Sequence, residues 1–224
     1  MANEIAKQEP NYFEKYGEAA TQRAIVGRLL KFTKFGEYVA GQDNMAVPIG
    51  TSLVAYMPSL AVGYVRWENS RPVDYQMGYV REGFVPPNRN DLEFNNMAQW
   101  EVDNTGRPRD PWQFTNSLIF IDLVDAKAFT FNTSSKGGLG AVGNLSKIYG
   151  RHVKTAPDDL PLIKLGVDSY RHFKREYGEI RVPVFEVEGW TPKDSLPYIE
   201  GLPSPDDDPP PPAEEVLLDD RVPF

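Results

Sequence analysis

Short apolar runs, each the length of a β-strand and each bounded by glycine or proline, constrain the fold of this chain most. Val26–Thr33, Ser52–Met57 and Leu60–Trp67 are rich in branched and aromatic residues, and Gly36 and Pro58 interrupt the series. Five further runs follow: Tyr75–Val80, Leu118–Val124, Lys127–Thr133, Leu162–Val167 and Ile180–Trp190. Runs of this length with this punctuation predict β-strands.

One segment between the predicted strands has helical periodicity. Within Gly138–Arg151, the apolar residues Leu139, Val142, Leu145 and Tyr149 recur at the spacing of one helix face. A β-rich body with one internal helix is typical of the OB-fold, a five-stranded Greek-key barrel. Because the predicted strands outnumber five, we expect a mainly β (β-rich α+β) protein, an elaborated OB-fold barrel with one internal helix.

The character of the chain changes after Trp190. Residues 191–213 are rich in proline and aspartate, and such a segment buries too little apolar surface to offset its ordering entropy. It predicts a disordered, semi-rigid linker. We therefore expect an N-terminal extension with a short helix in residues 1–25, an OB-fold-like domain in 26–190, the linker in 191–213 and an acidic tip in 214–224.

Charge is distributed unevenly along the chain. The net charge is −8, and residues 201–224 hold seven acidic residues and one arginine, a net of −6. The first 200 residues therefore carry −8 minus −6, or −2. Residues 134–181 contain nine Lys or Arg against five Asp or Glu, a net of +4, and both histidines. A basic segment combined with a separate acidic tail predicts a nucleic-acid or partner-binding function.

Several function classes are excluded by what the sequence lacks. There is no cysteine, which excludes disulfides and thiolate metal sites and indicates a cytoplasmic protein. The N-terminus has no signal-peptide pattern, and no apolar run approaches the ~20 residues that span a bilayer, so we expect no membrane association. His152 and His172 are too isolated to form a zinc site, and we expect no metal and no cofactor.

The end of the sequence regains apolar character and has the properties of a short ligand. Phe224 supplies a large apolar anchor beside its own carboxylate, which an arginine of a partner could bind. Pro223 restricts the backbone, and Asp219 and Asp220 attract a basic rim. These features predict a partner-binding tip formed by Asp219, Asp220, Val222, Pro223 and Phe224.

This tip resembles the C-terminal tip of the bacterial single-stranded-DNA-binding protein (SSB) family, and also the Phe-terminated acidic tails of several phage single-stranded-DNA-binding proteins. The resemblance covers residues 219–224 and the style of the linker, with Arg221 where the family usually has an acid. The body looks more like a divergent phage or prophage protein than like bacterial SSB. The resemblance implies a non-enzymatic protein of the host cytoplasm that coats single-stranded DNA without sequence specificity. It also implies recruitment of host or phage replication, recombination and repair proteins, and leaves homo-oligomerisation open.

Binding of single strands without sequence preference needs cations along the phosphates and aromatic rings on the bases. Several segments interleave the two residue types, and on Lys127–Thr133 strict alternation puts Phe129 and Phe131 on one face. Any aromatic on a barrel strand is also a core candidate, and we assign Phe32, Phe120 and Phe185 to the core. The candidates for DNA contact are Lys31, Lys34, Phe35, Tyr64, Arg66, Trp67, Arg71, Tyr79, Arg81, Trp112, Phe114, Phe129, Phe131, Ser135, Lys136, Lys147, Arg151, Lys154, Arg171, His172, Lys174 and Arg175.

Two other motifs indicate alternatives. Gly138–Gly143 satisfies the dinucleotide-binding pattern G-x-G-x-x-G, but no βαβ repeat surrounds it. We instead expect the serines, Lys136 and the glycine amides at this helix start to hold a DNA phosphate. The polar loop of residues 82–116 carries Asp91, Glu93, Glu101 and Asp103, which leaves a Mg²⁺-dependent phage nuclease as one alternative. A module that mimics an SSB tail without binding DNA is another.

Overall fold

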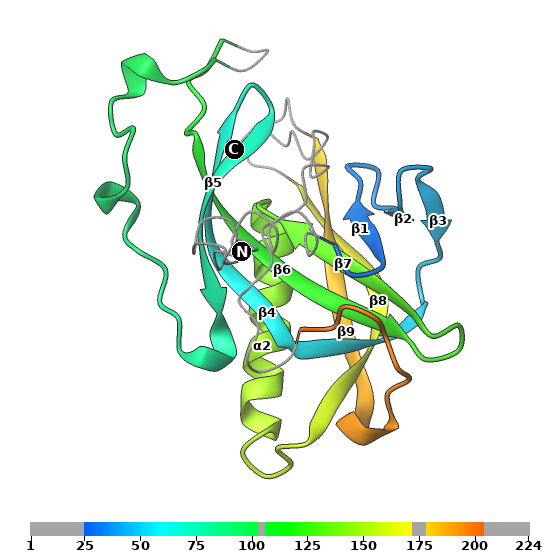
Figure 1. Cartoon of the computed structure of the whole chain (residues 1–224). Coiled ribbons are helices and arrows are strands. Elements are labelled where there is room, and N and C mark those ends of the chain that lie inside the picture. Colours follow the sequence, from blue (N-terminus) through cyan, green and yellow to red (C-terminus); the bar gives the residue numbers. More distant parts are fainter. Residues whose placement is uncertain (1–24, 103–105, 172–177, 204–224) are drawn as a thin grey trace, which may run out of the picture.

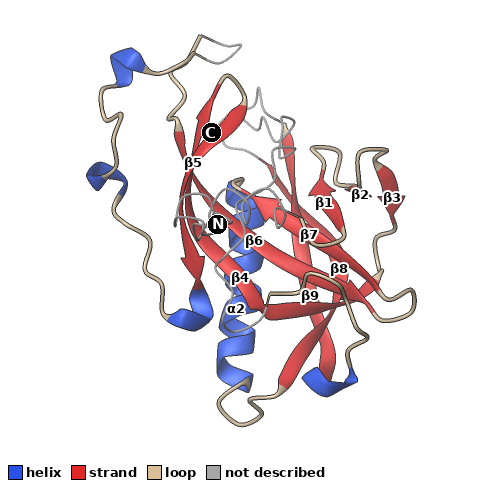
Figure 2. Ribbon diagram, viewed as in Figure 1, coloured by secondary structure: helices blue, strands red, loops and turns tan. Residues whose placement is uncertain are grey.

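The computed structural model of the chain describes residues 25–102, 106–171 and 178–203. Within these residues nine strands form one sheet, and one α-helix lies between the seventh and eighth strands (Figures 1 and 2). The sheet curls strongly into a half-barrel. The expected mainly β class with an OB-like barrel is therefore confirmed.

The sheet has the order β3-β2-β1-β7-β6-β4-β8-β9, and β5 pairs with β4 off this path. The strands are β1 (Arg28–Phe32), β2 (Tyr38–Ala40), β3 (Met45–Val47), β4 (Ser52–Glu68), β5 (Arg71–Tyr79), β6 (Trp112–Asp122), β7 (Lys127–Thr133), β8 (Asp159–Arg171) and β9 (Glu179–Pro192), and the helix is α2 (Lys136–His152). β1 runs parallel to β7, and the other paired strands are antiparallel.

The long strand β4 connects the two halves of the barrel. It pairs with β6 over most of its length and with β8 at its start. The pairing with β6 shifts register between Tyr56 and Ala61, which is where Pro58 lies. The predicted break at Pro58 is therefore wrong: the proline lies in an irregularity of a continuous strand, where the ladder does not need its missing N–H.

Side chains, instead of backbone pairing, join the β1–β2 hairpin to the β8–β9 hairpin. The buried Tyr38 hydroxyl donates a hydrogen bond to the Gly166 carbonyl at 2.8 Å. The Arg181 guanidinium donates to the Phe35 carbonyl. These contacts hold the β1–β2 hairpin against the β8–β9 hairpin, across the open side of the half-barrel.

The core lies inside the curled sheet and is rich in phenylalanine. The rings of Phe120 and Phe131 both contact Phe185, with centroid distances of 4.9 and 5.4 Å. Helix α2 covers part of this core by burying Ala141, Val142 and Leu145. The assignment of Phe120 and Phe185 to the core is confirmed, and Phe32 is partly buried at its border.

The C-terminal boundary of the body differs from the expected one. Leu196, Ile199 and Leu202 pack against the core, so residues 191–203 belong to the body and not to the linker. Their apolar side chains are spaced too irregularly among prolines for a sequence pattern to reveal them. The expected N-terminal helix, the rest of the linker and the acidic tip lie outside the described residues.

Replacing Tyr38 by phenylalanine is expected to lower the free energy of unfolding by about 1–2 kcal/mol, because a buried hydrogen bond is lost. Burial also raises the pKa of the Tyr38 hydroxyl above its ordinary value. Since an unfolded tyrosine ionises near pH 10, the stability that this group contributes is present below about pH 10 and is lost as the pH rises further. Urea unfolding of both proteins at neutral and alkaline pH tests this; an equal alkaline loss in the variant would contradict it.

Candidate nucleic-acid interface

Three parts of the chain that are distant in sequence meet at one end of the barrel. The start of β9 touches the β1–β2 turn, where a Cβ on Gly36 would lie 2.6 Å from the Arg181 side chain. It also touches the start of α2, where a Cβ on Gly137 would lie 2.6 Å from Val182. Figure 1 shows the start of α2 on the same side of the molecule as the end of β8, and the end of α2 on the opposite side. We call this surface the hairpin end; it comprises Lys34, Phe35, Lys136, Tyr170, Arg171 and Arg181.

The hairpin end combines exposed aromatic rings with cations. Phe35 is 61% exposed and Tyr170 is 47% exposed. The Lys34 ammonium lies 5.2 Å from the centre of the Phe35 ring, and Arg171 directly follows Tyr170. Such neighbouring pairs present a charge for a phosphate beside a flat face for a base.

The cations of the hairpin end also have no ion pair within the described residues. Lys34, Lys136 and Arg171 are exposed, and none forms an ion pair with a described residue. Seven cations elsewhere in the described chain do have carboxylate partners: Arg28, Arg66, Arg81, Arg89, Lys127, Lys164 and Lys193. Asp168 and Glu179 lie on the same hairpin, and Glu179 accepts a hydrogen bond from Ser169. The charges of these three cations are therefore free of carboxylate partners within the described chain.

The start of α2 is organised differently from the expected phosphate site. The Ser135 hydroxyl caps the helix by accepting a hydrogen bond from the Gly138 amide at 3.1 Å. A Cβ on Gly138 would overlap the Thr133 hydroxyl, so this glycine is required by packing. The expectation that Ser135 and the Gly138 amide hold a phosphate is therefore corrected, because they bind each other. Lys136 remains exposed beside them.

A second aromatic group lies on the paired strands β4 and β6. The half-buried rings of Tyr64 and Phe114 meet edge to face, with centroids 5.3 Å apart. The residue next to Phe114, Gln113, lies 3.4 Å from the Ser134 hydroxyl that precedes the helix. Trp67 lies further along β4 and is also half-buried. Because neighbouring residues of a strand point to opposite faces, the rings of Tyr64 and Phe114 lie on the other face of the sheet from Gln113, just after the loop between β5 and β6.

That loop adds an aromatic residue that the sequence analysis missed. The Phe94 ring lies 4.9 Å from the Arg66 guanidinium, which is also paired with Glu68 and Asp74. Arg89 holds Phe94 in place by donating to its carbonyl while binding Asp110 at 2.7 Å. Since these contacts join residues of a loop without periodicity, no sequence pattern indicated them.

Two carboxylates of the loop, Asp110 and Glu101, have structural roles. Asp110 binds Arg89, and Glu101 accepts a hydrogen bond from the Asn69 amide in the β4–β5 turn. Among the described residues no group of three His, Asp or Glu is arranged to hold a metal ion. Asp103 lies outside them.

Four aromatic candidates for DNA contact are buried, and the structure corrects them. Tyr79, Trp112, Phe129 and Phe131 are at most 8% exposed. The alternation on β7 is real, but its aromatic face is the interior of the barrel, where Phe129 lies opposite Phe120. A base cannot stack on a ring that solvent does not reach.

The remaining candidates are not part of the hairpin end. Lys31 is half-buried in β1, Arg71 is exposed at the start of β5, and the Arg81 guanidinium covers the Tyr79 ring at 4.3 Å. Three basic candidates gather near the other end of α2: Lys147, Arg151 and Lys154. His172, Lys174 and Arg175 lie outside the described residues, as do Asp219, Asp220, Val222, Pro223 and Phe224.

The end of α2 is fixed to the barrel by His152. Its ring stacks on Trp190 with centroids 3.5 Å apart, and its Nε2 lies 2.9 Å from a carboxylate oxygen of Asp159. This contact joins the helix to the start of β8 and the end of β9. The helix therefore runs from the hairpin end to the opposite end of the β8–β9 hairpin.

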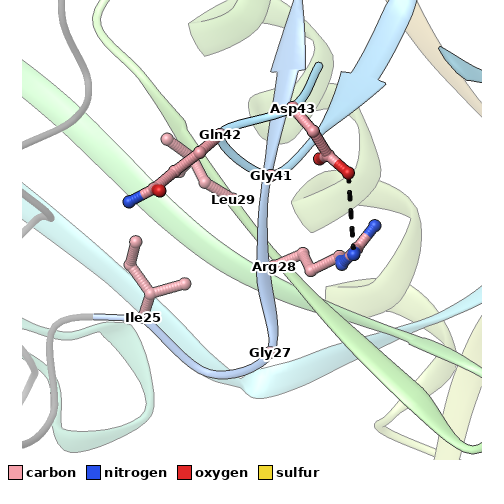
Figure 3. A pocket seen from close by; sticks show the side chains of 7 residues that line it. All are labelled: Ile25, Gly27, Arg28, Leu29, Gly41, Gln42 and Asp43. Carbon is pink, nitrogen blue, oxygen red and sulfur yellow. Dashed lines mark ion pairs between the residues drawn. The ribbon is translucent and has the colours of Figure 1, made fainter. Parts of the chain in front are cut away.

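A shallow pocket lies at the start of β1 (Figure 3). It has a volume of about 430 Å³ and is lined by Ile25, Arg28 and the β2–β3 turn. The Arg28 guanidinium lies 3.9 Å from the Asp43 carboxylate across it. None of the candidate DNA-contact residues lines this pocket, so it is separate from the interface.

Comparisons with models of protein families, with curated proteins and with solved structures give no match for this chain. Within the residues that the structure describes, no helix is both long and apolar enough to cross a membrane. The interface is therefore defined by geometry alone. Beyond the predicted residues it includes Tyr170, which adjoins the predicted Arg171, and Arg181, which only the folded chain brings into place.

Proposed function

We propose that this protein binds single-stranded DNA without sequence preference, through the hairpin end of its OB-like barrel. The observation that carries the proposal is the gathering of exposed Phe35 and Tyr170 with cations that have no carboxylate partner among the described residues. Stacking on such rings is sequence-tolerant, because every base has a flat face. The cations supply the phosphate contacts that make binding strong and salt-dependent.

The acidic tip has a separate role in this proposal. Asp219, Asp220, Val222, Pro223 and Phe224 recruit replication, recombination or repair proteins of a phage or its host. Support comes from the sequence alone, through the resemblance to SSB tips and the ligand-like chemistry of Phe224. No catalytic step is assigned to the protein.

Titration of labelled oligo-dT with the full chain and with a chain truncated after Pro203 tests both roles. The cut follows Pro203 because Leu196, Ile199 and Leu202 pack against the core. Both proteins should bind the oligonucleotide at low salt, and only the full chain should capture DNA-processing proteins. If neither protein binds, the DNA-binding proposal is wrong. Cleavage of the oligonucleotide that depends on Mg²⁺ would instead favour a nuclease.

A further inference from the structure

The exposed charged residues of α2 are all basic. The helix Lys136–His152 contains no aspartate or glutamate, while Lys136, Lys147 and Arg151 are all exposed. Lys154 is exposed two residues after the helix ends. None of these four cations pairs with a carboxylate among the described residues. The charged side chains exposed on this helix and directly after it at Lys154 are therefore all positive.

The basic residues lie on one face of the helix together with two glycines. Lys136, Gly140, Gly143, Lys147 and Arg151 are separated by four, three, four and four residues. Residues at these intervals lie above one another on an α-helix. We call this row the α2 track. Since the helix spans roughly 25 Å at ~1.5 Å per residue, the α2 track leads from Lys136 at the hairpin end to the opposite end of the barrel.

The two glycines of the α2 track have no role in packing the described fold. A Cβ on Gly140 or Gly143 would meet no described atom within 4 Å, whereas Gly137 and Gly138 are closely packed against Val182 and Thr133. Glycine inside a helix is less stable than alanine, so an open position gives no folding reason to keep it. A surface without side chains does, however, allow another backbone to approach closely.

We propose that the α2 track binds the phosphodiester backbone of the same DNA strand, beyond the part held at the hairpin end. This inference rests on the proposed function. The occupant follows from charge complementarity, because a row of cations without acids on its own helix fits a polyanion. The two carboxylates that follow the helix, Asp158 and Asp159, are engaged by Lys193 and His152. Backbone contacts of this kind lengthen the binding site and add no base preference.

The charge at the end of the α2 track, together with the adjacent Lys154, is tested with the full chain carrying Lys147→Gln, Arg151→Gln and Lys154→Gln. The control removes three cations that have carboxylate partners, as Arg28→Gln, Lys127→Gln and Lys193→Gln, so both variants have the same net charge. Each is titrated with oligo-dT of about 8 and about 30 nucleotides, since one OB-fold covers roughly 4–16. The α2 variant should lose affinity for the long oligonucleotide only. The slope of its log K against log salt should become shallower by about 2, since each contact contributes about 0.7.

The role of the glycines is tested with a double variant that carries Gly140→Gln and Gly143→Gln. The control is Ile148→Gln, which changes an exposed residue of the same helix that is not part of the α2 track. The double variant should melt at or above the temperature of the wild type, because glutamine is the better helix former. It should nevertheless bind the long oligonucleotide several-fold more weakly. Loss of binding without loss of stability supports a ligand on this face.

The outcomes separate this inference from the proposed function. If the wild type binds neither oligonucleotide, the proposed function fails, and the α2 track fails with it. If the wild type binds both and the α2 variants bind like their controls, only the α2 track is wrong. If the glycine variants change the sedimentation of the free protein and leave DNA affinity unchanged, this face contacts a second copy of the chain, which also overturns the inference.

Discussion

Replacing Lys34, Lys136 and Arg171 by glutamine is expected to weaken binding of oligo-dT about 100-fold at moderate salt, since each lost phosphate contact removes roughly 1 kcal/mol. The three side chains come from the β1–β2 turn, the start of α2 and the end of β8, and are exposed. The folded protein should be unaffected, because none of them forms an ion pair within the described residues. Fluorescence titration over a range of salt concentrations measures the loss.

The control for this prediction is the triple variant of Arg28, Lys127 and Lys193, which changes the net charge equally. These cations already have carboxylate partners at 3.9, 2.6 and 3.5 Å. If the control weakens binding as much as the hairpin-end variant does, affinity follows net charge and not a defined surface. Phe35→Ala provides a second arm: it should lower affinity about tenfold and leave the salt dependence unchanged, since stacking contributes roughly 1–3 kcal/mol per base.

The sequence carried most of the information about the barrel strands. Lys127–Thr133 has the predicted limits, and α2 extends the predicted helix by a turn or less at each end. Strand periodicity and turn residues are local properties, and local patterns are what a sequence shows directly. The strands β2 and β3 were missed because three residues each are too few to show a period.

The candidate interface was less predictable, because it depends on which face of a strand points inwards. Phe129 and Phe35 are both aromatic residues near cations in sequence, yet the first is buried and the second is exposed. Only the pairing of β7 with β1 and β6 decides this. The length of α2 likewise separates Lys136 from Arg151, although both belong to the same basic segment. Ion pairs such as Arg66 with Asp74 also neutralise charges in a way that composition does not reveal.

Helix α2 also contains a position where a single methyl group should disturb the fold. Gly138→Ala is expected to lower the free energy of unfolding by about 3 kcal/mol, because its Cβ would overlap the hydroxyl, Cβ and Cγ2 of Thr133. Thr133 is buried and β-branched, so it has little room to turn away. The shift would also disturb the Ser135 cap, which bonds both the Gly138 amide and the Thr133 hydroxyl.

The same change two residues later should have the opposite sign. Gly140→Ala adds its methyl group to open space and should raise the free energy of unfolding by up to about 1 kcal/mol, the difference in helix propensity. Urea unfolding of the two variants measures the contrast, and equal effects would contradict this account of the helix start. Thr133→Ala in the Gly138→Ala background removes two of the three overlapping atoms, so it should recover part of the loss. A double-mutant cycle with no coupling between these positions would show that the strain lies elsewhere.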